Sequence, residues 1–132
     1  MRTDWAEYGL GFVLSDGKIN GQNETDYLLH AMNIENDYDF VEVMNKKNRV
    51  CRIYDDDCGG KRFVPVNGSY KATEPDYMLV IWALNQTEPF APAYPGGPDE
   101  IRKEFYDILG EYLPNDFDWD AHIGYFNTVV SD

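Results

Sequence analysis

The chain has 132 residues, of which 43% are hydrophobic and 15% aromatic, a composition that excludes an intrinsically disordered protein and predicts one folded domain spanning residues 1–132. No stretch approaches the ~20 consecutive apolar residues that a membrane-spanning helix needs. Twenty-four acidic residues against eleven basic ones give a formal net charge of −13, which repels nucleic acid and anionic membranes and attracts basic surfaces.

The charge is distributed unevenly along the chain. Residues 46–71 hold seven basic and three acidic residues, whereas 24–42 hold six acidic and no basic residues and 104–132 hold seven acidic and no basic ones. Because nucleic-acid affinity depends on neutralising phosphates, the basic segment is too small for direct RNA binding by this acidic molecule. We expect it to pair with the protein's own acids or with an acidic patch on a partner.

The first expected elements are a strand and a short helix. Residues 8–15 predict a buried strand, in which Gly9 and Gly11 mark a bulge or a close approach of two backbones. A helix capped near Asn23 or Thr25 should follow after two turns. Its inward side is expected to contain Tyr27, Leu28, Ala31 and Met32.

The middle of the chain has the pattern of an antiparallel sheet. Residues 33–39 predict a loop, and residues 40–44 and 49–54 predict two strands of a hairpin, with Cys51 as a buried thiol. Residues 55–60 predict a turn or loop. Residues 62–66 predict an edge strand, because Pro65 cannot donate a ladder hydrogen bond. Residues 77–84 form the longest apolar run and predict a central strand.

A capped amphipathic helix begins at Pro98 and ends before Pro114. Its apolar stripe follows helical spacing and consists of Ile101, Phe105, Ile108, Leu109 and Tyr112. A last strand is expected over residues 121–130. The predicted fold class is therefore α+β: an antiparallel sheet of about five to six strands, packed by one long C-terminal helix and one short N-terminal helix.

The segment between this helix and the last strand, residues 115–120, concentrates acids and aromatics. Asp116, Asp118 and Asp120 have the opening spacing of a calcium-binding EF-hand loop, but Ala121 replaces its invariant glycine and Asn127 its bidentate glutamate. In an extended segment the three carboxylates would lie about 6–7 Å apart on one side, resembling phosphates along a nucleic-acid strand. An arginine-lined groove would accept them. The alternative is a solvated corner with its aromatics packed into the core.

Other candidate sites are weaker. Asp55, Asp56 and Asp57 form a secondary acidic cluster that could bind magnesium together with Glu7 or His30, although three aspartates before two glycines are usually a solvated turn. His122 could form an acid–base pair with Asp120. Ser15, Ser69 and Ser131 have no nucleophile context. Cys51 and Cys58 lack zinc-site spacing, and a disulfide is not expected in a reducing compartment.

These observations predict a non-catalytic acidic protein that inhibits a nucleic-acid-handling protein, of the phage anti-CRISPR or anti-restriction type, by occupying its basic nucleic-acid-binding surface. The expected partner-binding residues are Glu104, Asp107, Glu111, Asp116, Phe117, Asp118, Trp119 and Asp120. No cofactor, metal, direct nucleic-acid contact or membrane contact is expected.

Two alternatives for the function remain open. One is a cytosolic immunity-type protein that neutralises a basic partner such as a nuclease toxin. The other is a small metal-dependent enzyme that uses one of the Asp clusters. Because residues 1–5 contain no apolar segment of a signal peptide, we expect a cytoplasmic location, the host cytosol if a phage encodes the protein. Solubility alone is a third explanation of the charge, and the sequence leaves the oligomeric state open.

Overall fold

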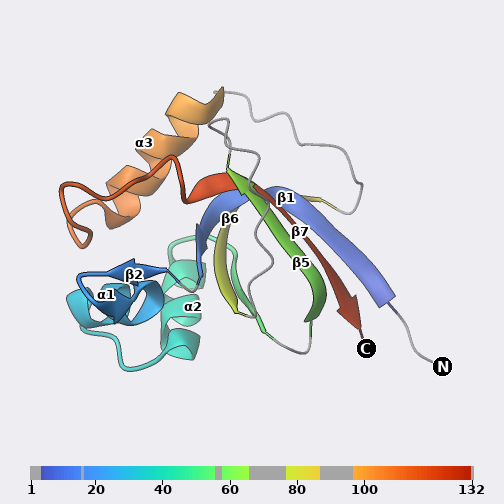
Figure 1. Cartoon of the computed structure of the whole chain (residues 1–132), viewed down its shortest axis with the longest axis horizontal. Helices are drawn as coiled ribbons and strands as arrows, with labels where there is room; N and C mark the ends of the chain where they lie inside the picture. Colours follow the sequence, from blue (N-terminus) through green and yellow to red (C-terminus); the bar gives the residue numbers. More distant parts are fainter. Residues whose placement is uncertain (1–3, 16, 56–57, 66–76, 87–96, 132) are drawn as a thin grey trace.

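The computed structural model describes residues 4–15, 17–55, 58–65, 77–86 and 97–131. The elements, in chain order, are β1 (Asp4–Leu14), β2 (Lys18–Ile19), β3 (Gln22–Asn23), α1 (Glu24–Ala31), α2 (Asp37–Lys46), β4 (Cys51–Tyr54), β5 (Cys58–Pro65), β6 (Met78–Gln86), α3 (Gly97–Leu109) and β7 (Ile123–Ser131). Figure 1 shows α1, α2 and α3 on one side of a strongly curved sheet.

The main sheet within these ranges has five strands in the order β4-β6-β1-β7-β5, and every neighbouring pair is antiparallel. The predicted α+β class with an antiparallel sheet is confirmed. The strand with Pro65 lies at an edge, and the apolar run of residues 77–84 forms most of the interior strand β6. The first strand, β1, occupies the centre of the sheet, between β6 and β7.

Gly11 allows the backbones of β1 and β6 to approach closely. The register shifts between Leu10 and Gly11, which pair with Leu84 and Trp82. A Cβ atom built on Gly11 would lie 2.5 Å from the carbonyl oxygen of Ile81, a distance that real Cβ atoms essentially never show. The sequence-based prediction of a bulge or close approach in this strand is therefore confirmed at Gly11.

The segment 40–44 is helical, so the predicted hairpin of residues 40–54 is wrong. Asn36 caps α2, with its side chain accepting a hydrogen bond from the Asp39 N–H at 2.9 Å. Phe40 and Met44, one helical turn apart, are both fully buried. The spacing of these two large side chains and the cap favour a helix more than the alternating valines favour a strand. The helix also includes residues 37–39, which were expected to be part of a loop. The strand β4 pairs with β6 instead.

The other differences concern helices and strand ends. The described residues contain three helices rather than two, and a two-stranded ribbon, β2–β3, precedes α1. In α1 the buried apolar residues are Leu28 and Leu29, whereas Ala31 is exposed. Residues 58–60, predicted as loop, belong to β5, because β7 is long enough to pair with them; the register is irregular between Gly59 and Arg62.

The core has a part on each face of the sheet. On the face covered by the helices, Phe12, Leu14, Leu79 and Ile81 pack with residues of α1, α2 and α3. Side chains that alternate with them along the strands form a second cluster around Trp82, whose indole N–H donates to the Tyr54 hydroxyl at 3.2 Å. In α3 the predicted stripe is confirmed by the buried Ile101, Phe105 and Leu109. The helix ends at Leu109 rather than just before Pro114, so Tyr112, the last residue of the predicted stripe, lies in the turn that follows it. Cys51 is buried, as predicted.

Candidate functional site

The chain between α3 and β7 forms a compact corner, which we define as residues 114–122. Backbone hydrogen bonds fold it into successive turns: the N–H of Phe117 donates to Pro114, that of Trp119 to Phe117 and that of His122 to Trp119, each at 3.1 Å. The Asp118 carboxylate accepts from the Ala121 N–H at 3.2 Å. The expected extended geometry, with three carboxylates projecting to one side, is therefore wrong, because the aspartate stabilises a turn.

The two aromatic residues of the corner pack against the sheet. The rings of Phe117 and Trp119 lie with their centroids 6.0 Å and 5.7 Å from that of Phe12 in β1, and 5.1 Å from each other. Both side chains are half-buried against the main core. The alternative, in which the corner's aromatics pack into the core, is confirmed. A partner-binding role for these two residues stays a prediction.

The predicted acidic site residues have different surroundings. Asp107, Glu111, Asp116 and Asp118 are exposed. Asp120 pairs with Arg102, its Oδ1 lying 2.6 Å from a guanidinium nitrogen. Only part of the predicted acidic set therefore presents an uncompensated carboxylate to solvent.

Glu104 pairs with Arg49, whose side chain comes from the basic segment of the chain. Lys61 of the same segment donates to the backbone carbonyl of Asp55, and its side chain is buried. The expectation that the basic segment pairs with the protein's own acids is confirmed for Arg49. Of the secondary acidic cluster, Asp55 is exposed, and Asp56 and Asp57 lie outside the described residues.

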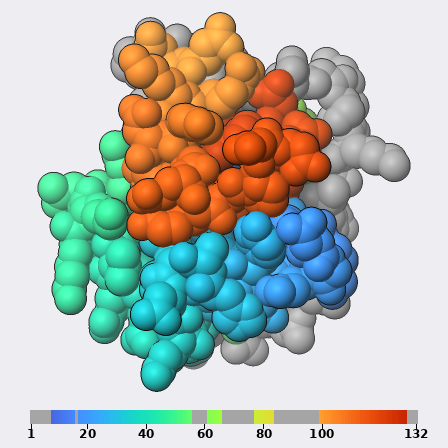
Figure 2. All heavy atoms as spheres, turned by 90° about the vertical axis from the view of Figure 1, so that its left-hand side faces the viewer, coloured from blue at the N-terminus to red at the C-terminus, as the bar shows by residue number. Residues whose placement is uncertain are grey.

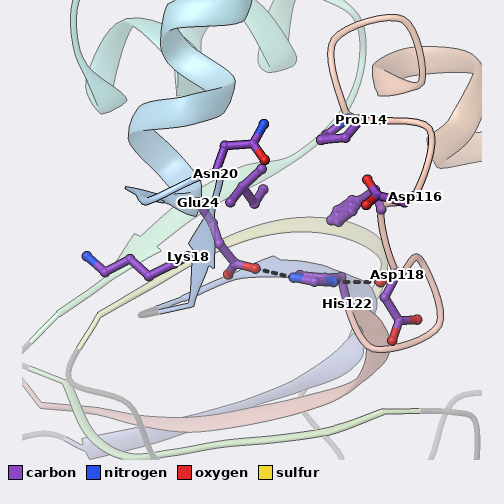
Figure 3. A pocket seen from close by; sticks show the side chains of 9 residues that line it. Lys18, Asn20, Glu24, Pro114, Asp116, Asp118 and His122 are labelled. Atoms are coloured by element: carbon purple, nitrogen blue, oxygen red, sulfur yellow. Dashed lines mark hydrogen bonds and ion pairs between the residues drawn. The ribbon is translucent and has the colours of Figure 1, made fainter.

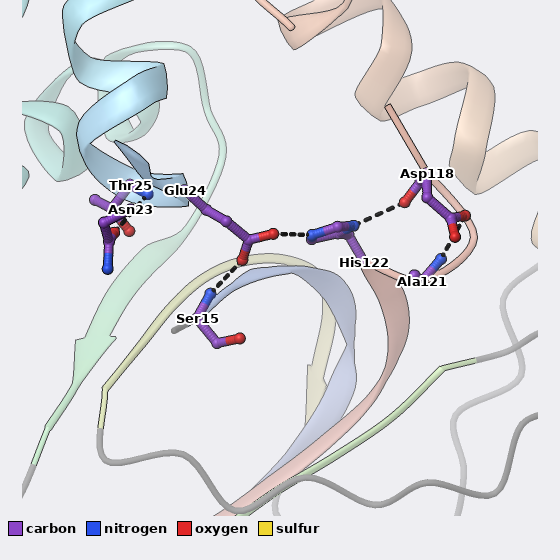
Figure 4. Close-up of polar contacts among 7 residues, drawn as sticks. All are labelled: Ser15, Asn23, Glu24, Thr25, Asp118, Ala121 and His122. Carbon is purple, nitrogen blue, oxygen red and sulfur yellow. Dashed lines mark hydrogen bonds and ion pairs between the residues drawn. The ribbon is translucent and has the colours of Figure 1, made fainter. Parts of the chain in front are cut away.

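A buried carboxylate and an imidazole, far apart in the sequence, join the corner to α1. Nε2 of His122 contacts Oε2 of Glu24, and Nδ1 of His122 donates to the backbone carbonyl of Asp118 at 2.7 Å. The other carboxylate oxygen of Glu24 accepts from the Ser15 N–H at 3.0 Å. Figure 4 shows this chain of contacts running from β1 through α1 to the corner. The side chain of Glu24 is 7% exposed and that of His122 is 17% exposed.

The pKa of His122 is raised above its ordinary value of 6.5. Burial by itself lowers the pKa, but the hydrogen bond and charge of Glu24, together with the Asp118 carbonyl, raise it by more. Because both ring nitrogens face oxygen acceptors, the arrangement favours the doubly protonated imidazolium. The expected acid–base pair of His122 with Asp120 is not formed. With both nitrogens engaged, His122 holds the corner in place and is not free to act as a base.

Glu24, His122 and the corner border a pocket of about 250 Å³. Figure 3 shows the Glu24–His122 pair across the base of this pocket, with Asn20 and Asp116 on opposite sides. Pro114 and Phe117 contribute apolar lining from the corner. A second pocket, of about 380 Å³, lies beside the amino-terminal ends of α1 and α2 and is lined by Thr25, Asp26, Glu35 and Tyr77, among others.

The two acid-rich, base-free stretches of the sequence meet on one face of the molecule. Figure 2 shows the end of α3 and the corner (orange) directly beside α1 (cyan), and the Glu24–His122 contact joins the two segments. We call this surface the acidic face. The exposed carboxylates of the two stretches that meet there are Asp26, Glu35, Asp39, Glu42, Asp107, Glu111, Asp116 and Asp118. Two tyrosines that the sequence does not predict as site residues are also exposed: Tyr38 in α2, with 73% of its surface accessible, and Tyr106 in α3, with 58%.

In the part of the chain that the structure describes, no three His, Cys, Asp or Glu side chains are grouped so as to hold a metal ion. None of the described helices is long and apolar enough to cross a membrane. No family model, curated protein or solved structure matches this chain.

Proposed function

We propose that this protein is a non-catalytic acidic binding protein that inhibits a nucleic-acid-handling protein by covering its basic, nucleic-acid-binding surface, in the manner of a phage anti-CRISPR or anti-restriction protein in the host cytosol. The observation that carries this proposal is the acidic face, where two separate base-free stretches, each with exposed carboxylates, lie side by side. A surface of one charge sign attracts a partner of opposite sign and accelerates the encounter.

Folding adds support beyond the net charge, because the internal ion pairs leave a defined set of carboxylates facing solvent. Glu104 and Asp120 are compensated by Arg49 and Arg102. Asp107 and Asp116 are exposed, and they come from α3 and from the corner. Charge presented from two rigidly packed segments is suited to a partner surface of fixed shape, whereas a charged tail would not be.

Tyr106 is the aromatic anchor that this face offers. Its ring packs edge-to-face on Trp119, with centroids 5.6 Å apart and planes at 60°, and it remains 58% exposed. Asp107 is its neighbour in the sequence and is exposed as well. Tyrosines held in one position beside charged groups are favoured at protein interfaces, where they also stack with arginine.

The proposal is tested by capture from a bacterial lysate at low salt, with the immobilised protein as bait. The expected result is retention of a DNA- or RNA-handling protein that is displaced by duplex DNA or RNA and by raising the salt from about 50 to about 500 mM. The informative variant combines Asp107→Asn, Glu111→Gln and Asp116→Asn, since these side chains are exposed. The variant should lose most of the capture.

The matched control keeps every charge and alters only side-chain length: Asp107→Glu, Glu111→Asp and Asp116→Glu. It should retain capture. A captured protein that neither raised salt nor added nucleic acid displaces would contradict the proposal. Capture of a nuclease toxin in place of a defence enzyme would assign the neutralising, immunity-type alternative.

A further inference from the structure

The pocket bordered by the corner is built from three separate segments. Strand β2 and the turn after it contribute Ile19 and Asn20, α1 contributes Glu24, and the corner contributes Pro114, Phe117 and His122. Its volume of about 250 Å³ is suited to one side chain and not to a large cofactor. Because the corner and α1, which border the pocket, meet on the acidic face, a group that enters the pocket belongs to whatever covers that face.

The lining has apolar walls and an anionic side. Ile19, Pro114 and Phe117 offer apolar surface, and the exposed Asp116 carboxylate lies on one side. The two carboxylate oxygens of Glu24 are engaged by His122 and by the Ser15 N–H. Lys18 also borders the pocket, but Figure 3 shows its side chain extending away from the other labelled groups. The pocket therefore favours a ligand with an apolar stem and a cationic head.

We infer that this pocket receives an arginine side chain of the partner protein, an inference that rests on the proposed function. Asn20 and Asp116 lie on opposite sides of the opening, and the planar guanidinium, with five N–H donors in a fixed fork, can reach acceptors on both sides. Phe117, stacked on Trp119 at an interplanar angle of 27°, adds an aromatic ring on which a guanidinium packs. A lysine ammonium is a point charge and uses fewer of these contacts.

The inference is tested without the partner, by titrating ¹⁵N-labelled protein with Nα-acetyl-arginine amide and following the backbone amide signals. Saturable shifts are expected at Asn20, Asp116 and Phe117. The lysine analogue should bind several-fold more weakly, and the norleucine analogue, which has a stem but no charge, should leave these signals in place. Asp116→Asn should weaken arginine-analogue binding about tenfold, the factor expected for one charge-assisted hydrogen bond.

Asp107→Asn is the matched control, because it removes one exposed charge of the same face outside the pocket, and it should change the affinity less than twofold. Non-saturating shifts scattered over α2 and α3 would overturn the inference, as would equal binding of the three analogues. If a nucleic-acid-handling partner is captured and Asp116→Asn alone does not weaken that capture, the pocket does not hold the partner's arginine. Failure to capture any such partner overturns the proposed function, a result independent of the titration.

Discussion

The carboxylate of Glu24 and the imidazole of His122 meet across 98 positions of sequence and tie the start of α1 to the corner before β7. Glu24 is held in turn by the Ser15 N–H at the end of β1, and His122 by the Asp118 carbonyl. The imidazole ring also stacks on Phe12, with centroids 6.0 Å apart. One buried ion pair thus connects the central strand, the first helix and the corner of the acidic face.

This pair makes stability depend on pH. The pKa of His122 in the folded protein is raised above 6.5, so its contribution to stability is fully present below the unfolded pKa and is lost as pH rises through the folded pKa. Urea unfolding of the wild type and of Glu24→Gln should differ by about 2 kcal/mol at mildly acidic pH, the size expected for a hydrogen bond between charged groups. The difference should shrink at alkaline pH.

The matched control for this prediction is His30→Gln. His30 is the other histidine of the chain, is exposed on α1 and contacts the Gln22 side chain. In a His30→Gln background, the effect of Glu24→Gln on the free energy of unfolding should be the same as in the wild type at each pH. A stability difference between wild type and Glu24→Gln that stays constant across this range, or that grows with pH, would show that His122 is not protonated in the folded protein.

A side chain at Gly17 is expected to disturb the same pair. A Cβ atom on Gly17 would lie 2.9 Å from the carboxyl carbon of Glu24, whose two oxygens are already held by His122 and Ser15. Gly17→Ala should therefore cost about 1 kcal/mol of stability and lower the pKa of His122, measured by NMR titration of the ring protons. Lys18→Ala, at the exposed neighbouring position, should do neither. An unchanged His122 titration in Gly17→Ala would contradict the prediction.

The Arg49–Glu104 ion pair should contribute to stability rather than to partner binding. The two side chains are 34% and 18% exposed and link the chain before β4 to α3. A double-mutant cycle with Arg49→Met and Glu104→Gln should give a coupling energy of about 1 kcal/mol from unfolding curves. Glu104→Gln should weaken partner capture less than Asp107→Asn does. The reverse order would mean that Glu104 leaves Arg49 when the partner binds.

Cys51 should be chemically inert while the protein is folded. The side chain is buried, and burial raises the pKa of its thiol to about 12, so the reactive thiolate is scarce at neutral pH. In a Cys58→Ser background, a disulfide reagent at mildly alkaline pH should modify Cys51 no faster than the protein opens, and at once in concentrated urea. Rapid modification of the folded protein would show that β4 separates from the helices more readily than the packing indicates.

Local patterns in the sequence predicted much of the fold. The apolar stripe of α3 follows from the spacing of Ile101, Phe105 and Leu109, and the edge position of β5 follows from Pro65. The two alternating valines in the segment of α2 predict a strand, and this prediction is wrong because the segment is helical. The helix is favoured because it buries both Phe40 and Met44 in the core. Burial depends on how distant segments pack together, so it cannot be predicted from a short stretch of sequence.

The candidate site was less predictable than the fold. Exposed acids such as Asp107 and Asp116 were recognised, because charge without neighbouring bases is visible in sequence. Glu24 contacts His122, 98 positions away in the sequence, and Glu104 contacts Arg49, 55 positions away. Contacts at such separations cannot be predicted from the spacing of neighbouring residues. The strand-like spacing expected for the corner is wrong for a different reason: the Asp118 carboxylate and carbonyl bind Ala121 and His122 three and four residues further on, and these local hydrogen bonds fold the segment into turns.

The position of β1 in the sheet also determines when folding can be completed. β1, the first strand of the chain, pairs along its length with β7, the last, from Asp4 opposite Ser131 to Phe12 opposite Ile123. During synthesis its hydrogen-bonding edge on that side stays unpaired until β7 has left the ribosome. Pairing over such a sequence separation closes a large loop, which slows folding. Nascent chains that stop short of β7 therefore leave one edge of the central strand open to aggregation.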